Sequence, residues 1–206
     1  SPAPLPNAGQ VLLDGLVKPR QQGAYAPRDE CAKLPGAATF REALAMAVLR
    51  RDAAAIAALA QGDVRLGFGG DDGRERLREK LAGNGGALMQ ELDALLRLGC
   101  AADVQGGMTM PWYFAQDYGD LDSYSAMLVT GAGVPLHAAA DAAAPVKQRL
   151  SWDVVELDEG LLPDKPFQKV SARGGAKGYI ATGKLRSMLD YRLLAARQNG
   201  QWKISA

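Results

Sequence analysis

The sequence predicts an α+β protein in which a mostly helical domain is followed by a small domain of short strands. Two patterns support this prediction. Between residues 37 and 100, apolar residues recur at the spacing of amphipathic helices. From residue 126 onward, short apolar runs end at turn-forming residues, as they do in compact β-domains. A chain of 206 residues is long enough for two such domains.

The expected organisation has three parts. Residues 1–36 form an extended, proline-rich segment, residues 37–125 a helical α+β domain, and residues 126–206 a strand-rich domain that closes with a hairpin. Residues 116–125 are polar and rich in turn-forming residues, and therefore make the best linker candidate. Within the first part, the apolar run 11–13 suits either a strand or a helical turn.

Composition limits the classes of partner. The formal net charge is +1, so no strong field attracts nucleic acid or an anionic membrane surface. No run of about 18 apolar residues is present, so no transmembrane segment is expected. The prolines at the start are typical of a mature chain after removal of a signal peptide, and we expect a periplasmic or otherwise exported protein. A trimmed cytosolic chain would have the same composition.

Two helices begin the second part. An apolar stripe that starts at Phe40 and recurs at helical spacing predicts the first helix. Thr39 together with Glu42 matches a capping box at its start, because each side chain can bind an unpaired backbone N–H. Asp52 is expected to cap the second helix, over residues 53–61.

The rest of the second part mixes strands and helices. Alternation over residues 64–68 predicts a strand, and helices are expected over residues 74–81 and 87–98. Gly99 suits the left-handed residue that ends the last of these helices. Residues 108–114 suit one strand that a proline interrupts.

The helix pair and strand over residues 39–69 resemble the opening of the cystatin-like fold of the nuclear-transport-factor-2 superfamily. The resemblance implies a cone-shaped domain that can hold a small molecule. A run of long antiparallel strands should then follow, whereas this sequence continues with two further helices.

The chain has two cysteines, Cys31 and Cys100, each at the edge of an expected element. Together with the single histidine they supply too few ligands for a structural zinc site, which needs four. A disulfide between them suits an exported protein, and two buried free thiols are the alternative. In the chain-entropy model, a bridge that closes a loop of about 70 residues stabilises the fold by roughly 4 kcal/mol.

The last third of the chain carries an ordered series of short motifs. In sequence order they are Val134 and Leu136, Pro145 and Val146, Leu150, Val154 and Val155, Lys169 and Val170, the run 177–180, and Leu185. Each motif is loose, but their order and spacing over residues 126–188 resemble those of a bacterial SH3 domain. The resemblance implies a small SH3-like β-barrel, a type of module that binds ligands and rarely performs chemistry. Asn199 and Gly200 then predict the tight turn of a terminal hairpin.

This sequence departs from the bacterial SH3 pattern at three positions. His137 stands where the family has an arginine, and Trp152 lies near the place of a family glycine. Phe167 replaces a tryptophan that often lines the family's binding groove. Trp152 is a candidate to supply the missing aromatic face. The alternative is that Trp152, Phe167 and Tyr179 belong to the core and rim of the barrel.

Two glycine-rich stretches imitate nucleotide-binding loops. Residues 178–184 have the spacing of a phosphate-binding loop, but Leu185 stands where magnesium binding needs a hydroxyl. In residues 67–73, Asp72 occupies a required glycine position, and a carboxylate suits a helix N-terminus better than a phosphate. His137 is expected on the surface of the barrel without catalytic or metal-binding partners. We therefore expect no metal, no cofactor and no enzymatic activity.

The leading functional hypothesis is a non-catalytic binding or scaffolding protein of the bacterial cell envelope. Its ligand would be a peptide, a peptidoglycan fragment or an envelope protein, held in a groove between the barrel and the helical domain. Aromatic side chains are favoured anchors, and the candidates are Trp112, Tyr113, Trp152 and Tyr179. Two alternatives are a small-molecule or enzymatic pocket in residues 37–125 and a structural subunit whose sheet edge pairs with a partner.

Overall fold

The computed structural model describes residues 8–17 and 21–206 of the chain. These residues contain both helices and antiparallel sheets, so the predicted α+β class is confirmed. No helix within these two ranges is long and apolar enough to cross a membrane.

The chain folds into two compact units. The helical unit comprises residues 8–17, 27–115 and 191–206, and the sheet unit comprises residues 21–26 and 116–190. The chain therefore enters the sheet unit twice, first for a short segment and then for a long one. This division differs from the expected domain boundaries, because the terminal hairpin belongs to the helical unit and not to the strand-rich unit.

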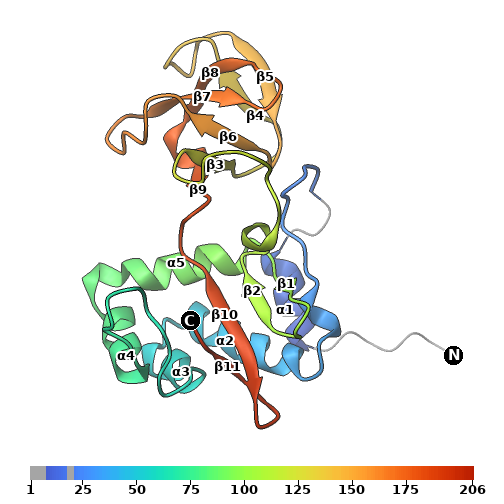
Figure 1. Ribbon diagram of the computed structural model, residues 1–206, viewed down its shortest axis with the longest axis vertical. Helices are drawn as coiled ribbons and strands as arrows, with labels where there is room; N and C mark the ends of the chain where they lie inside the picture. Colours follow the sequence, from blue (N-terminus) through green and yellow to red (C-terminus); the bar gives the residue numbers. More distant parts are fainter. Residues whose placement is uncertain (1–7, 18–20) are drawn as a thin grey trace, which may run out of the picture. The chain divides into compact units, whose positions relative to one another are not determined.

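The helices of the helical unit surround a common apolar core (Figure 1). They are α1 (Ala8–Leu16), α2 (Ala37–Leu49), α3 (Ala53–Ala58), α4 (Arg74–Ala82) and α5 (Ala87–Leu96). The core includes Leu44 of α2, Ile56 of α3 and Leu95 of α5, and each of these side chains is almost fully excluded from solvent. Burying a side chain of this size contributes about 2 kcal/mol.

Of the two helix caps predicted from the sequence, one is confirmed and the other is wrong. Asp52 caps α3 as expected, since its Oδ1 atom accepts a hydrogen bond from the Ala55 N–H at 2.9 Å. The capping box expected at Thr39 and Glu42 is wrong, because α2 begins earlier, directly after Gly36. Gly36 has a φ of 74°, a left-handed conformation that glycine adopts without strain, and no side chain caps the helix.

A four-stranded antiparallel sheet completes the described part of the helical unit. Its strands are β1 (Ala101–Ala102), β2 (Met108–Met110), β10 (Leu193–Gln198) and β11 (Gln201–Ile204), in the order β1-β2-β10-β11. The predicted hairpin forms between β10 and β11, with Asn199 and Gly200 both at positive φ in its turn. Because β10 also pairs with β2, the last residues of the chain join the sheet of the helical unit (Figure 1).

Three expected elements of this unit differ from the structure. Residues 64–68 form no strand, although the Arg65 N–H donates to the Ser205 carbonyl beside β11. The strand expected over residues 108–114 ends at Met110, because Pro111 has no N–H for a ladder, and a 3₁₀ helix follows. Near the N-terminus, α1 replaces the expected extended chain. Residues 1–7 and 18–20 lie outside the described residues.

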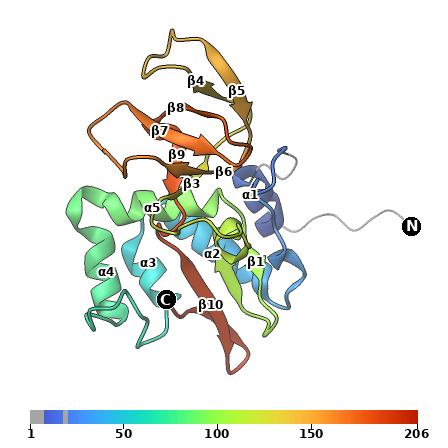
Figure 2. The same cartoon turned by 45° about the horizontal axis from the view of Figure 1, so that its top comes forward.

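The sheet unit is built from short antiparallel strands. They are β3 (Ala126–Val129), β4 (Val134–His137), β5 (Val146–Leu150), β6 (Val154–Leu157), β7 (Phe167–Ala172), β8 (Lys177–Ala181) and β9 (Leu185–Ser187). Within residues 116–190 they form a seven-stranded sheet in the order β5-β4-β8-β7-β6-β3-β9 (Figure 2). No strand pairing joins the outer strands β5 and β9 in this range, so the sheet is open.

The core of the sheet unit consists of inward-facing residues that alternate with outward-facing ones along strands β3 to β8. Leu136, Val170 and Ile180 are fully buried in one apolar cluster. Gly178 lies beside them, where a Cβ atom would stand 2.5 Å from the carbonyl oxygen of His137. Strands β4 and β8 can therefore approach each other only because no side chain is present at this position.

Candidate functional site

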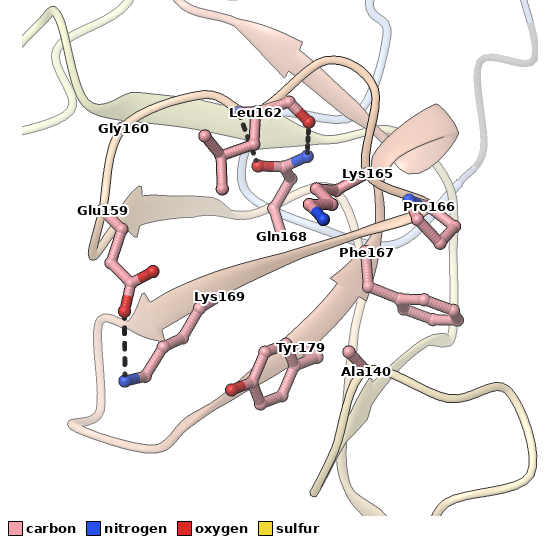
Figure 3. A pocket seen from close by; sticks show the side chains of 10 residues that line it. All are labelled: Ala140, Glu159, Gly160, Leu162, Lys165, Pro166, Phe167, Gln168, Lys169 and Tyr179. Carbon is pink, nitrogen blue, oxygen red and sulfur yellow. Dashed lines mark hydrogen bonds and ion pairs between the residues drawn. The ribbon is translucent and has the colours of Figure 1, made fainter.

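A pocket of about 310 Å³ lies on the outer face of the sheet unit (Figure 3). Strands β7 and β8 form its floor through Phe167, Lys169 and Tyr179. The loop between β6 and β7, residues 158–166, contributes most of its remaining lining. The pocket thus combines regular strands with one irregular connection.

The alternation of β7 and β8 places the aromatic residues of the pocket. Phe167 and Lys169 face outward, whereas Gln168 between them is buried, as the two-residue period of a strand requires. Lys169 pairs directly with Tyr179 of β8, so Phe167 and Tyr179 are diagonal neighbours on the same face. Both rings are half-buried, and the pocket therefore offers partly exposed aromatic surface.

Gln168 fixes the wall of the pocket from inside the sheet unit. Its Nε2 group donates to the Leu162 carbonyl at 2.7 Å and to the Thr182 hydroxyl at 2.9 Å. Its Oε1 atom accepts from the Leu162 N–H at 3.0 Å (Figure 3). The Thr182 hydroxyl in turn donates to the Lys165 carbonyl at 2.5 Å. The buried amide therefore holds Leu162 directly, and Thr182, which the same amide contacts, holds Lys165.

The charged groups of the pocket are one carboxylate and two ammonium groups, so the lining carries a formal charge of +1. Glu159 pairs with Lys169 at 3.6 Å across the rim. Lys165 has no ion-pair partner among the described residues and is exposed. The pocket therefore presents apolar faces beside a positive edge, a combination that suits a ligand with an apolar group and a carboxylate.

His137 is buried, and the expectation that it lies on the surface is wrong. Only 6% of the residue is exposed, and its Nδ1 atom lies 3.0 Å from the Ala144 carbonyl oxygen. Its ring meets Phe167 edge to face, with ring centroids 5.8 Å apart. Val134 and Leu136 of β4 belong to the core, so the two-residue period places His137 on the opposite face, beside its strand partner Tyr179. It is buried there because the Phe167 ring and the Ala144 carbonyl contact it.

The four aromatic residues that the sequence proposed as contacts are distributed over both units. Tyr179 lines the pocket, but Trp152 is 7% exposed and its Nε1–H donates to Gln21 within the sheet unit. Trp112 and Tyr113 belong to the helical unit and are also buried. Phe167, which replaces a family tryptophan and is not among the proposed contacts, also lines the pocket. Its place at a position that lines the binding groove in the family is the sequence signal that points to this role.

Two polar contacts of Trp112 lie within the helical unit. Its Nε1–H donates to the Glu30 carboxylate at 3.0 Å, and the Arg28 guanidinium stands over its ring at 5.0 Å. The indole is therefore an internal structural element whose polar edge is satisfied inside the protein.

The predicted disulfide between Cys31 and Cys100 is present, with Cα atoms 5.8 Å apart. Beside it, Arg41 forms an ion pair with Asp29 at 2.8 Å and is only 2% exposed. Asp29 also accepts a hydrogen bond from the Cys31 N–H at 3.0 Å. These groups connect the N-terminal segment, α2 and the start of β1, and this cluster holds the helical unit together.

The described ranges contain no group of three histidine, cysteine, aspartate or glutamate residues placed to hold a metal ion. No protein-family model, no curated protein and no solved structure matches the chain. The interpretation of the pocket therefore rests on its own geometry.

Proposed function

We propose that this chain is a non-catalytic binding protein of the bacterial cell envelope, in which the sheet unit acts as an SH3-like barrel that binds a peptide. The peptide would come from a partner protein or from the stem peptides of peptidoglycan. The pocket formed by Phe167, Tyr179 and the loop 158–166 is its binding site.

The observation that carries this proposal is the pair of half-exposed rings beside a rigid loop wall. Phe167 and Tyr179 offer flat apolar surface at a low cost in side-chain entropy, which is why aromatic residues are frequent binding anchors. Gln168 keeps the opposite wall in place, so a ligand would not have to order it.

The resemblance to bacterial SH3 domains supports the same function. Its sequence motifs fall on successive short antiparallel strands, from Val134 in β4 to Leu185 in β9. The Gly178–Tyr179 motif lies in β8, where the glycine permits close strand approach and the tyrosine lines the pocket. The disulfide supports an oxidising compartment, as expected for an exported protein.

The test is a binding measurement on the full chain. A peptide library is selected against the wild-type protein, and the best peptide and a purified peptidoglycan stem peptide are then titrated calorimetrically. Tyr179→Ala should weaken binding about tenfold or more, because a truncated aromatic anchor costs at least 1–2 kcal/mol. Tyr124→Ala is the matched control, since Tyr124 is an 86% exposed tyrosine of the same unit outside the pocket. Equal affinity in both variants would contradict the proposed site.

A further inference from the structure

Residues 21–26 belong to the sheet unit, although the chain on either side of them belongs to the helical unit. We call this segment the strap. It is joined to the rest of the sheet unit by side-chain and backbone contacts, which fall at Gln21, Gly23 and Tyr25. The strap contains a turn over residues 23–26, in which the Ala26 N–H donates to the Gly23 carbonyl at 3.3 Å. It therefore lies on the sheet unit as a turn, with Gln21, Gly23 and Tyr25 in contact.

Tyr25 makes the most specific of these contacts and is 6% exposed. Its N–H donates to the Trp152 carbonyl at 3.0 Å, and its hydroxyl donates to the Asp117 carbonyl at 2.9 Å. The Arg173 guanidinium donates to the same hydroxyl at 2.7 Å and lies 5.4 Å from the ring centroid. The hydroxyl is thus engaged both as a donor and as an acceptor, so the surface distinguishes tyrosine from phenylalanine.

The other two contacts of the strap are also selective. The Trp152 Nε1–H donates to the Gln21 side-chain oxygen at 2.5 Å. At Gly23, a Cβ atom would stand 2.2 Å from the Ser151 carbonyl oxygen, and φ is 126°, so only glycine fits. Arg173 is placed by its own contacts, a hydrogen bond to the Tyr118 carbonyl and an ion pair with Asp153 at 3.8 Å.

From these contacts we propose that the Trp152–Arg173 face of the sheet unit is a second peptide-recognition surface and that the strap is its occupant in cis. The surface selects a segment that turns at a glycine and carries glutamine two residues before it and tyrosine two residues after it, as in Gln21, Gly23 and Tyr25. A tethered segment has an effective concentration in the millimolar range, so the strap excludes competing peptides unless it detaches. This proposal is independent of the Phe167 pocket, which shares none of these residues.

The experiment uses the full chain and a synthetic peptide of residues 19–27. In the Tyr25→Ala chain the strap loses its anchor, and the added peptide should bind the vacated surface, with amide shifts at Trp152 and Arg173. The wild-type chain should bind the same peptide at least about tenfold more weakly, because its own strap occupies the surface. Peptides carrying alanine in place of Gly23, or phenylalanine in place of Tyr25, should bind the variant chain at least about tenfold more weakly.

Two peptide-binding results would overturn the proposal. One is a folded Tyr25→Ala chain that does not bind the peptide, and the other is a wild-type chain that binds it equally well. The double variant Tyr25→Ala/Arg173→Ala is the control for binding elsewhere and should not respond. If circular dichroism shows that Tyr25→Ala does not fold, Tyr25→Phe replaces it. The backbone amide of residue 25 in this variant should then exchange at least about tenfold faster than in the wild-type chain. Unchanged exchange would also overturn the proposal.

Discussion

The helical unit uses its polar and aromatic groups internally, whereas the sheet unit leaves several of them at its surface. In the helical unit, Trp112 donates to Glu30 and Arg41 pairs with Asp29, next to a disulfide that joins residues 69 positions apart. In the sheet unit no cysteine is present, and the rings of Phe167 and Tyr179 are half-exposed around a pocket.

The way in which each unit is stabilised indicates which of them is suited to carry a binding site. The helical unit is assembled from chain segments far apart in sequence, and covalent and ionic contacts offset the entropy of bringing them together. The sheet unit forms mostly from one continuous segment, and the strap is its only described residues from elsewhere in the chain. Its outer face is therefore free to carry binding groups, which supports placing the binding function in the sheet unit.

Removing the disulfide should produce the largest effect and should affect the helical unit selectively. The double variant Cys31→Ser/Cys100→Ser loses a bridge across 69 positions of sequence, which the chain-entropy model values at about 4 kcal/mol of unfolding free energy. Denaturant unfolding followed by circular dichroism in the helix band measures this loss. The NMR resonances of Val170 and Ile180 in the sheet unit are the internal control and should be unchanged. An unchanged helical transition would contradict the account.

Breaking the buried ion pair should cost slightly less. In Asp29→Ala, the Arg41 charge remains at 2% exposure without its carboxylate, and its Nε atom already lacks a hydrogen-bond partner among the described residues. A buried charge left unpaired typically costs about 3 kcal/mol. The surface pair of Asp93 and Arg97 is the matched comparison, and Asp93→Ala should change the unfolding free energy by less than about 0.5 kcal/mol. Equal effects of the two variants would show that the buried pair has no special role.

Loosening the pocket wall should have a smaller effect that is confined to the sheet unit. Gln168→Leu removes the three hydrogen bonds that the amide makes to Leu162 and Thr182, at a cost of about 1–2 kcal/mol. The Leu162 amide should then exchange faster with solvent, and peptide affinity should fall because the wall is no longer preorganised. Gln148→Leu is the control, since Gln148 is exposed on the edge strand β5. Unaltered exchange at Leu162 would contradict the inference that Gln168 holds this loop in place.

The smallest effect is expected on the solvated face of α4. The hydrogen bond from the Arg78 guanidinium lowers the pKa of Glu75, with Nε and Oε1 2.9 Å apart. Because the folded-state pKa is lowered, the pair stabilises the protein above the usual glutamate pKa, and this contribution is lost as the pH falls through the folded-state value. An NMR titration of the Glu75 carboxyl in wild type and in Arg78→Ala measures the shift. The pKa should return toward its usual value in the variant, and identical titrations would contradict the assignment.

Sequence reasoning recovered the elements that depend on local chemistry. The cap at Asp52 and the turn at Asn199 and Gly200 follow from the conformations that these residue types prefer, and both are present. The Cys31–Cys100 bridge was expected because an exported chain with one cysteine pair favours it.

The features that sequence reasoning missed depend on partners distant in sequence. The terminal hairpin looked like a continuation of the strands before it, but β10 pairs with β2, some 85 positions earlier in a register that no local pattern encodes. Phe167 and Lys169 form a pocket only because Gln168 holds the loop beside them. The strap contacts at Tyr25 likewise involve Asp117, Trp152 and Arg173, which are far along the chain.

The most direct test of the central claim is to map the amide resonances of the full chain during titration with a peptide selected against it. We predict chemical-shift changes at Phe167, Lys169 and Tyr179 and in the loop 158–166, with the helical unit unperturbed. Changes confined to residues 27–115 and 191–206 would place the binding function in the helical unit and contradict the account.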